Sequence, residues 1–242
     1  MAVDWQLKGM SSSVVLYHFG TKDDLVAECY RSVIEFMPRP DDWRPGLEVT
    51  GYWWPRRPEG WEPPSEVVEF LESGFAPVFL GLGSLMLSES SAARLSETIG
   101  RALQLAGVRG IVQSGGAGLN VADATTLTIG TLPHDWLFPR MAAAAHSCGA
   151  GTTAAALRAG IPTIPIPLPG GDQPFWARRL HALGASPTPL PRPKLTPERL
   201  ARAIDDALAN PVYRTGTQTL AAGITEENGA AIAVDVIEKL LG

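Results

Sequence analysis

The stretch Ala145-His-Ser-Cys-Gly-Ala-Gly-Thr-Thr-Ala-Ala-Ala-Leu-Arg-Ala-Gly-Ile-Pro-Thr-Ile-Pro-Ile-Pro-Leu-Pro-Gly-Gly-Asp-Gln-Pro-Phe-Trp176 decides the fold of this chain. It predicts a small-residue strand, a glycine turn that begins a helix, a second apolar strand, and a Gly-Gly-Asp-Gln loop that begins another helix. A glycine turn at a helix N-terminus presents free backbone N–H groups, and the helix dipole there favours negative charge. Asp172 and Gln173 add two hydrogen-bonding side chains next to that turn. We therefore expect this stretch to bind a phosphorylated sugar.

The same alternation of apolar strands and helices runs through most of the chain, with Gly and Pro at the turns between them. The predicted strands are Pro77–Gly81, Gly110–Gln113, Leu127–Gly130, Ala142–Ser147 and Pro162–Pro167. The predicted helices are Ser65–Ser73 with Ser65 as its N-cap, Ser91–Ala106, a short piece at Trp136–Met141, Thr152–Ala159, Pro174–Leu183, Thr196–Ala209 with Thr196 as its N-cap, and Thr225–Leu241. This order predicts an α/β fold with a doubly wound, Rossmann-like parallel sheet.

Composition narrows the range of partners and compartments. The 242 residues are 45% apolar and 19% charged, as in ordinary globular proteins, and the net charge of -5 argues against a nucleic-acid partner. Cys29 and Cys148 are far apart and fit neither a metal site nor a disulfide framework. No apolar run approaches the ~20 residues of a transmembrane helix, and the first residues carry no export signal. We expect a cytoplasmic protein with no metal and no transmembrane segment.

The chain divides into three parts. Residues 1–37 form a segment of unclear origin in which Lys22–Phe36 has helical spacing, and Ser11–Leu25 resembles the end of the helix-turn-helix of tetracycline-repressor-type regulators. The earlier helices of such a domain are missing, so DNA binding is not expected. Residues 38–64 form a connector rich in Trp and Pro, whose aromatic residues we expect to pack against a domain face. Residues 65–242 form the α/β domain.

Three glycine-containing loops follow predicted strands: Gly81–Leu85, Ser114–Gly118 and Cys148–Thr153. The carboxyl ends of parallel strands lie at one edge of the sheet, where such folds bind ligands, and glycines let a ligand approach the backbone. Together with Asp172 and Gln173, the three loops favour a nucleotide-type site.

Several residues in this region allow more than one interpretation. Gly149–Ala154 fits the dinucleotide pattern G-x-G-x-x-A, with Asp172 near the spacing of a ribose-binding acid, but the pattern comes late and Asp172 precedes a helix. A nicotinamide-dependent oxidoreductase is therefore the less favoured hypothesis. His134 is either an active-site base paired with Asp135 or part of a turn cap. His146 either reaches a phosphate or is a strand-end histidine with its hydrogen bonds satisfied.

Seven segments match, in order, a known pattern: Pro38-Arg-Pro-x-x-Trp43, Val49-Thr-Gly-Tyr-Trp53, Gly81-x-Gly-Ser84, Pro133-His-Asp-Trp-Leu-Phe-Pro139, Gly149-Ala-Gly-Thr-Thr153, Ala159-Gly-Ile-Pro162 and Gly171-Asp-Gln-Pro-Phe-Trp176. From about Pro38 onward, the chain resembles the carboxyl-terminal half of a family 1 glycosyltransferase. The most similar branch holds sterol 3-beta-glucosyltransferases and the vancomycin- and macrolide-type enzymes. The resemblance implies one half of a GT-B architecture that binds a nucleotide-diphosphate sugar, usually UDP-glucose.

The resemblance also implies roles for individual residues. Gly83 and Ser84 would approach the pyrophosphate or sugar, and His134 would line the nucleoside pocket with the Leu132 backbone. The diphosphate would lie at the turn formed by His146, Ser147, Gly149, Ala150, Gly151, Thr152 and Thr153, and Asp172 and Gln173 would bind sugar hydroxyls. The family has a second histidine where this chain has Ser147, a glycine where it has Cys148, and one residue fewer before Asp172.

Chemistry in the family is inverting transfer to an acceptor hydroxyl, in which a helix N-terminus rather than a metal or cofactor stabilises the departing UDP. Family members take lipophilic acceptors such as sterols or natural-product aglycones. Their acceptor site and catalytic base belong to an amino-terminal domain that this sequence does not contain, so we assign no base and expect the chain to transfer sugar poorly or not at all by itself. A separate polypeptide that supplies this half is one candidate partner. The alternative hypothesis is a non-catalytic remnant or partner subunit.

Overall fold

A computed structural model describes residues 50–55, 57–121 and 123–241 of the chain. The segment 1–37, with its predicted helix and its repressor-like stretch, and the first part of the connector lie outside the described residues.

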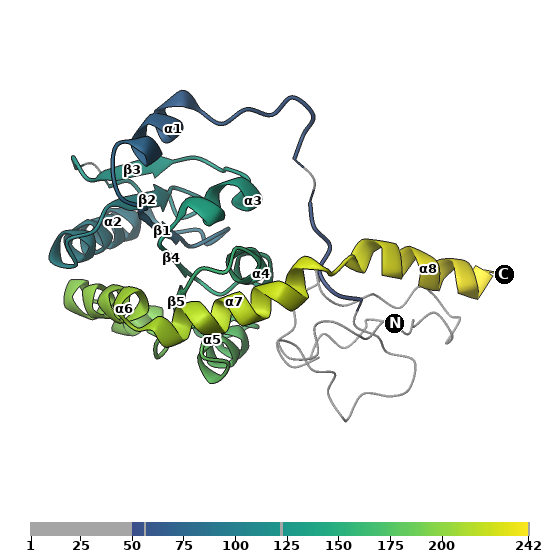
Figure 1. Cartoon of the computed structure of the whole chain (residues 1–242). Helices are drawn as coiled ribbons and strands as arrows, with labels where there is room; N and C mark the ends of the chain where they lie inside the picture. Colours follow the sequence, from purple (N-terminus) through teal and green to yellow (C-terminus); the bar gives the residue numbers. More distant parts are fainter. Residues whose placement is uncertain (1–49, 56, 122, 242) are drawn as a thin grey trace.

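The five predicted strands form one parallel sheet (Figure 1). They are β1 (Val78–Gly81), β2 (Gly110–Gln113), β3 (Thr126–Ile129), β4 (Ala143–His146) and β5 (Thr163–Pro165). The spatial order is β3-β2-β1-β4-β5, so the direction of winding reverses between β1 and β4. The register pairs Gly81 at the end of β1 with His146 at the end of β4. The predicted doubly wound α/β fold is confirmed.

The helices around the sheet mostly agree with the prediction. They are α1 (Ser65–Glu72), α2 (Glu89–Leu105), α3 (His134–Leu137) followed by a 3₁₀ turn at Phe138–Arg140, α4 (Ala150–Arg158), α5 (Gln173–Ala182), α6 (Pro197–Ala209), α7 (Pro211–Thr225) and α8 (Gly229–Leu241), with a further 3₁₀ turn at Arg192–Lys194. The Thr196 cap is confirmed, since its hydroxyl oxygen accepts a hydrogen bond from the Arg199 N–H at 3.3 Å.

Two predictions about helices are wrong. Ser65 is not the N-cap of α1: Pro64 holds that position, and the helix has no side-chain cap. The last helix does not run over Thr225–Leu241, because α7 ends at Thr225 and α8 begins at Gly229. The sequence does carry a start signal for α7: the Asn210 side chain accepts a hydrogen bond from the Val212 N–H at 3.2 Å, and Pro211 fits the first helical position.

Side chains alternate between the two faces of the sheet and give it a separate core on each face. Val78 and Leu80 of β1 face α2 and α6, whereas Phe79 faces α1, α3 and α4. A third buried cluster joins α4 to α5 and α7 around Trp176. The arrangement leaves the carboxyl ends of the strands to the loops that follow them.

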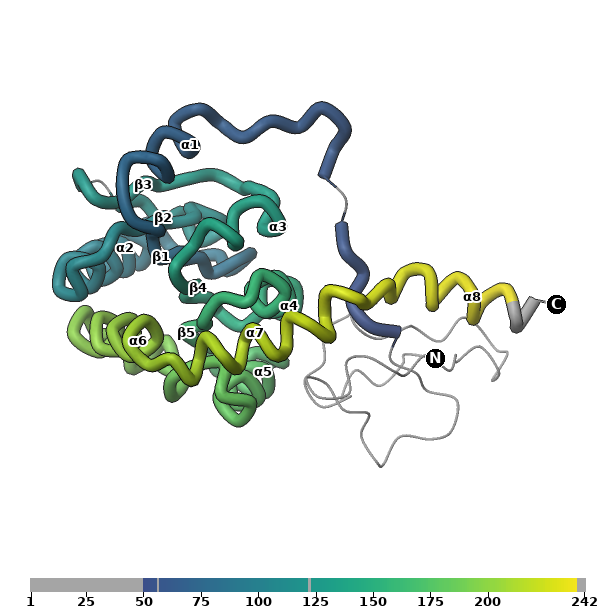
Figure 2. Tube along the Cα trace, viewed as in Figure 1, coloured from purple at the N-terminus to yellow at the C-terminus, as the bar shows by residue number. Residues whose placement is uncertain are grey.

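The described part of the connector arches from the junction of α7 and α8 to α1, and α8 projects away from the sheet (Figure 2). Its aromatic residues do contact the domain, as predicted. The Trp54 ring lies 4.2 Å from the Arg158 guanidinium on α4, and the Trp61 ring meets Trp136 of α3 at 5.6 Å in an edge-to-face arrangement. Trp53, in contrast, remains 51% exposed.

Candidate functional site

The three glycine loops meet at the carboxyl edge of the sheet, where the strand order reverses between β1 and β4. The Gly116 N–H, after β2, donates to the Gly83 carbonyl, after β1, at 3.2 Å. A Cβ added to Gly83 would lie 4.0 Å from the Ser147 hydroxyl oxygen, after β4. The predicted convergence of these loops is therefore confirmed.

The turn of residues 147–152 joins β4 to α4 through one unusual conformation. Cys148 has a φ of 63°, and it is the one non-glycine residue with positive φ in the described part of the chain. Its side chain points away from the turn into the buried cluster around Trp176, where burial raises the pKa of the thiol. Cys148 therefore does not add bulk on the open side of the turn.

After Cys148, the backbone enters α4 with its N-terminus open. Gly149 is the N-cap residue, and a Cβ added to Gly149 or to Gly151 would meet no heavy atom within 4 Å. The first N–H groups of a helix have no acceptor within that helix, and no side chain caps α4. Thr152 is half-buried beside these groups, Ala150 is buried, and Thr153 is fully buried with no hydrogen-bond partner for its hydroxyl among the described residues. The open N–H groups can receive an anion.

His146 lies beneath this turn and is completely buried. Its Nδ1 accepts a hydrogen bond from the Cys148 N–H at 3.1 Å, while its Nε2 has no partner among the described residues. Burial, and to a smaller extent the nearby His134, lower the pKa of His146 to about 3. The sequence left His146 as either a phosphate contact or a strand-end histidine with satisfied hydrogen bonds. The geometry favours the strand-end histidine, with one of its two ring nitrogens hydrogen-bonded.

His134 begins α3 and forms a wall of the same region. Its ring stacks on Phe138 with centroids 4.3 Å apart, and it meets Phe79 edge-to-face at 5.8 Å. Burial lowers the pKa of His134, and the charge of Asp135 opposes that shift. The Asp135 carboxylate lies 2.8 Å from the Arg57 guanidinium of the connector. Leu132 is buried in the core on this face of the sheet, and Trp136 and Phe138 are core residues.

Asp172 and Gln173 lie at the start of α5, and the side chain of each accepts a hydrogen bond within the protein. Asp172 is the N-cap residue, and its carboxylate accepts a hydrogen bond from the Trp176 indole at 2.9 Å. The Gln173 side-chain oxygen accepts from the Leu168 N–H at 2.9 Å, which folds the preceding loop back onto the helix. Asp172 thus lies at a helix start rather than at the end of a strand, where a ribose-binding acid is expected.

The sequence did not single out Phe79 or the connector residues Arg57 and Trp61 as part of this region. Phe79 could have been found from alternation, because it shares a face of β1 with Gly81, whose missing side chain leaves room for the Phe79 ring. The contact of Arg57 has no sequence signal, and the packing of Trp61 could be predicted but not its partner on α3, since both contacts depend on the path of an irregular segment.

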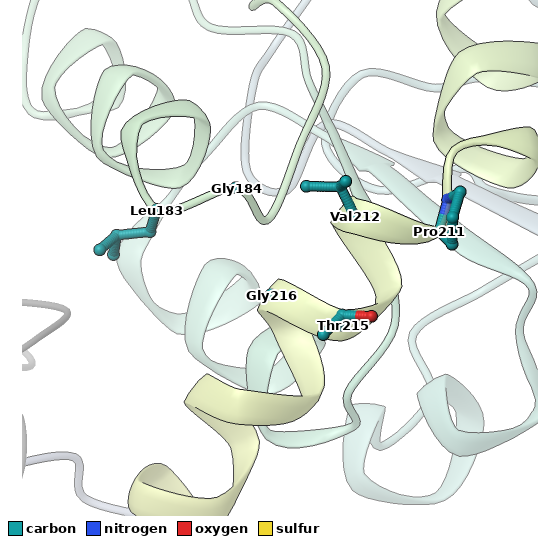
Figure 3. A pocket seen from close by; sticks show the side chains of 6 residues that line it. All are labelled: Leu183, Gly184, Pro211, Val212, Thr215 and Gly216. Carbon is teal, nitrogen blue, oxygen red and sulfur yellow. The ribbon is translucent and has the colours of Figure 1, made fainter.

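A separate pocket of about 370 Å³ lies away from this edge, between the end of α5 and the start of α7 (Figure 3). It is lined by Leu183, Gly184, Pro211, Val212, Thr215 and Gly216. The carbonyl of Ala185, which directly follows the lining residue Gly184, accepts a hydrogen bond from the N–H of Thr163, the first residue of β5. The pocket is therefore at the amino edge of the sheet, and it includes none of the predicted site residues.

The described residues contain neither a metal-binding cluster nor a helix suited to span a membrane. No three His, Cys, Asp or Glu side chains in this part of the chain cluster closely enough to hold a metal ion. None of its helices combines the length and the apolar composition that crossing a bilayer requires.

Comparison with known sequences gives both a family and relatives. Residues 119–240 match the family model described as the erythromycin biosynthesis protein CIII-like, C-terminal domain. The chain is 37% identical over 246 aligned positions to sterol 3-beta-glucosyltransferase UGT80A2 of Arabidopsis thaliana, covering 100% of this chain and 38% of that protein. It is 34% identical to O-mycaminosyltylonolide 6-deoxyallosyltransferase of Streptomyces fradiae, covering 84% of this chain and 47% of that one. The chain thus spans less than half the length of these curated relatives.

Solved structures share the fold at lower sequence identity. The glycotransferase of kitacinnamycin matches 89% of this chain and 53% of its own, with a TM-score of 0.66 at 20% identity. The glycosyltransferase VinC, solved in complex with dTDP, matches 71% of this chain and 44% of its own, with a TM-score of 0.56 at 21% identity. These neighbours are GT-B proteins, and the described domain corresponds to about half of each.

Proposed function

Because the chain belongs to the family of the erythromycin biosynthesis protein CIII-like C-terminal domain, we propose that it is the donor-binding part of a glycosyltransferase and binds a UDP-sugar. The proposed site is the carboxyl edge of β1 and β4, with the diphosphate at the turn of residues 147–152. The observation that carries the proposal is the open N-terminus of α4, where Gly149 and Gly151 leave the backbone free of side chains.

The surrounding residues support a division of roles around that turn. The exposed Gly83 and Ser84 lie across from Ser147 and border the diphosphate from the β1 side. The nucleoside lies toward His134 and the Leu132 backbone, against the aromatic wall that includes Phe79. Asp172 and Gln173 lie on the sugar side, where carboxylate and amide oxygens accept hydrogen bonds from hydroxyls.

The same turn can stabilise the UDP that leaves when the sugar is transferred. As the bond from the sugar to the diphosphate breaks, negative charge grows on the UDP oxygen, and the N–H groups and dipole of α4 stabilise it. We propose that transfer needs no metal or other cofactor, since the helix N-terminus holds the charge that a cation would otherwise balance. Because His146 is buried and neutral, it adds no positive charge there.

The acceptor is proposed to be the hydroxyl of a lipophilic molecule, as the names of the sterol and tylonolide relatives indicate for those proteins. Both relatives are more than twice the length that the chain matches. We propose that an amino-terminal half, in the same or a separate polypeptide, supplies the acceptor site and the base that deprotonates the hydroxyl. A cytoplasmic location is also proposed, and the free, buried Cys148 is consistent with a reducing compartment.

Replacing Gly151 with Leu tests the proposed diphosphate site. The added side chain has open space in the folded protein, and removing a glycine from the first turn of α4 favours the helix slightly, so stability should hold or rise. The same side chain would fill the space that the diphosphate needs, so UDP affinity measured by calorimetry should fall at least tenfold.

Ala222→Leu is the matched control, because it adds a similar side chain at an exposed position of α7. It should leave UDP binding unchanged. Equal UDP affinity in Gly151→Leu and wild type, or no binding heat from wild type at millimolar UDP, would contradict the proposed function.

A further inference from the structure

The most informative group outside the proposed ligand contacts is the buried imidazole of His146. It is the last residue of β4 and shares a sheet face with Ala144, on the side covered by α3 and α4. Three hydrogen bonds join His146 to the surrounding loops. The ring Nδ1 accepts one from the Cys148 N–H, and the backbone carbonyl accepts two, from the Ile166 N–H at 2.8 Å and the Cys148 thiol at 3.7 Å. His146 therefore ties together the strand end, the turn and the segment that leaves β5.

The Nδ1 bond acts on the most strained residue of the turn. A left-handed conformation costs a non-glycine residue roughly 1–2 kcal/mol, and Cys148 holds it at a φ of 63°. The residues that follow Cys148 are Gly149, the N-cap, and Ala150, the first residue of α4. A change of conformation at Cys148 would therefore change the direction in which the first N–H groups of α4 point.

The tautomer of His146 follows from the same bond. A backbone N–H can only donate, so Nδ1 carries no proton and the neutral ring carries its proton on Nε2. That Nε2–H is a buried donor with no partner among the described residues, which costs about 1–3 kcal/mol. The satisfied ring nitrogen is the one that faces Cys148.

We propose that His146 is a positioning residue, which does not touch the diphosphate but fixes Cys148 through Nδ1 and so orients the N–H groups that bind it. This inference rests on the proposed function. The positioning role belongs to Nδ1, whereas a histidine that binds the phosphate directly would do so through Nε2, so the two roles can be tested separately.

Two variants distinguish the ring nitrogens. His146→Asn places an amide oxygen near the position of Nδ1, where it can accept the Cys148 N–H bond, whereas His146→Gln reaches the position of Nε2. The proposal expects UDP affinity within about threefold of wild type for the Asn variant and at least tenfold weaker for the Gln variant. Equal affinities, equal losses, or a larger loss for the Asn variant would each overturn it.

A second measurement tests the role of Nδ1 even if the Gln variant fails to fold or wild type fails to bind UDP. Long-range proton–nitrogen NMR correlations of the histidine rings in the wild-type chain should report His146 as the tautomer protonated on Nε2, unchanged between pH 8 and pH 5. The Nδ1-protonated tautomer, or titration within that range, would overturn the proposal. Loss of UDP binding in wild type with the expected tautomer would instead contradict only the proposed function.

Discussion

At the residue scale, the two histidines of the site are both held in their neutral form by burial. His134 and His146 both have lowered pKa values because burial disfavours the imidazolium, and His146 is the more enclosed of the two. A neutral imidazole at His146 keeps a lone pair on Nδ1 for the Cys148 N–H. Protonation there would break that bond and place an unpaired charge in the core.

This environment predicts a loss of stability as the pH falls. The unfolded chain binds a proton at His146 below the usual pKa of about 6.5, whereas the folded chain does so only near 3. Between these values the unfolded state holds more protons, so the free energy of unfolding falls by about 1.4 kcal/mol per pH unit as the pH decreases. Wild type should therefore lose about 2 kcal/mol more than His146→Asn between pH 7 and pH 5 in denaturant titrations.

His134 changes stability in the same direction, but it is present in both proteins, so most of its contribution cancels in the comparison. Identical pH dependence in wild type and His146→Asn would mean that His146 is not protonated differently in the folded and unfolded chains.

At the element scale, the connector holds α3 in place. The Arg57–Asp135 ion pair has partners 47% and 40% exposed, so its contribution to stability is at most about 1 kcal/mol. The half-buried Trp61 against Trp136 contributes more, because it buries apolar surface in an edge-to-face contact. Since α3 carries His134, the connector also supports the proposed nucleoside wall.

Trp61→Ala should therefore lower the free energy of unfolding by about 1–2 kcal/mol and weaken UDP binding severalfold, because α3 loses the contact that fixes it. Trp53→Ala is the control: this side chain is 51% exposed, and its indole N–H bonds only the nearby Thr50 hydroxyl in the described structure. Chemical denaturation and calorimetry measure the two effects. Similar results for both variants would contradict a specific role for Trp61.

The elements that sequence could predict were those with a strong local signal. The five strands and the helix capped by Thr196 follow from apolar runs, glycine turns and a cap, all of which act within a few residues. Helix α7 was missed although Asn210 and Pro211 mark its start, because its interior carries glycine and threonine and lacks a clear apolar stripe. The loops around Ser147 could be predicted to meet, whereas the Nδ1 bond of His146 could not, because it depends on the left-handed conformation of Cys148.

At the scale of the whole molecule, Glu227 joins the connector to the junction of α7 and α8. Its carboxylate accepts from the Tyr52 N–H at 3.0 Å, its carbonyl accepts from the Trp54 indole at 3.2 Å, and the Gly229 N–H donates to the Tyr52 carbonyl at 3.2 Å. Burial raises the pKa of Glu227, and the Tyr52 N–H opposes that shift. These bonds fix the point from which the connector arches to α1 and α8 projects away from the sheet in Figure 2.

Two surfaces on opposite edges of the sheet could receive a ligand. The glycine loops at the carboxyl edge are polar and open, whereas the pocket of Leu183 and Gly216 in Figure 3 is largely apolar and borders α7. The start of α7 at the pocket is capped by Asn210, whereas the N-terminus of α4 is uncapped and lies beside exposed glycines, so we place the diphosphate at α4.

The most direct test is to map backbone amide NMR shifts of the nitrogen-15-labelled chain during titration with UDP. We expect the largest shifts at Gly83, residues 149–152 and the loop before Asp172, with little change at Leu183 or Gly216. Shifts centred on the Leu183–Gly216 pocket, or none at millimolar UDP, would contradict the placement of the diphosphate at the turn of residues 147–152.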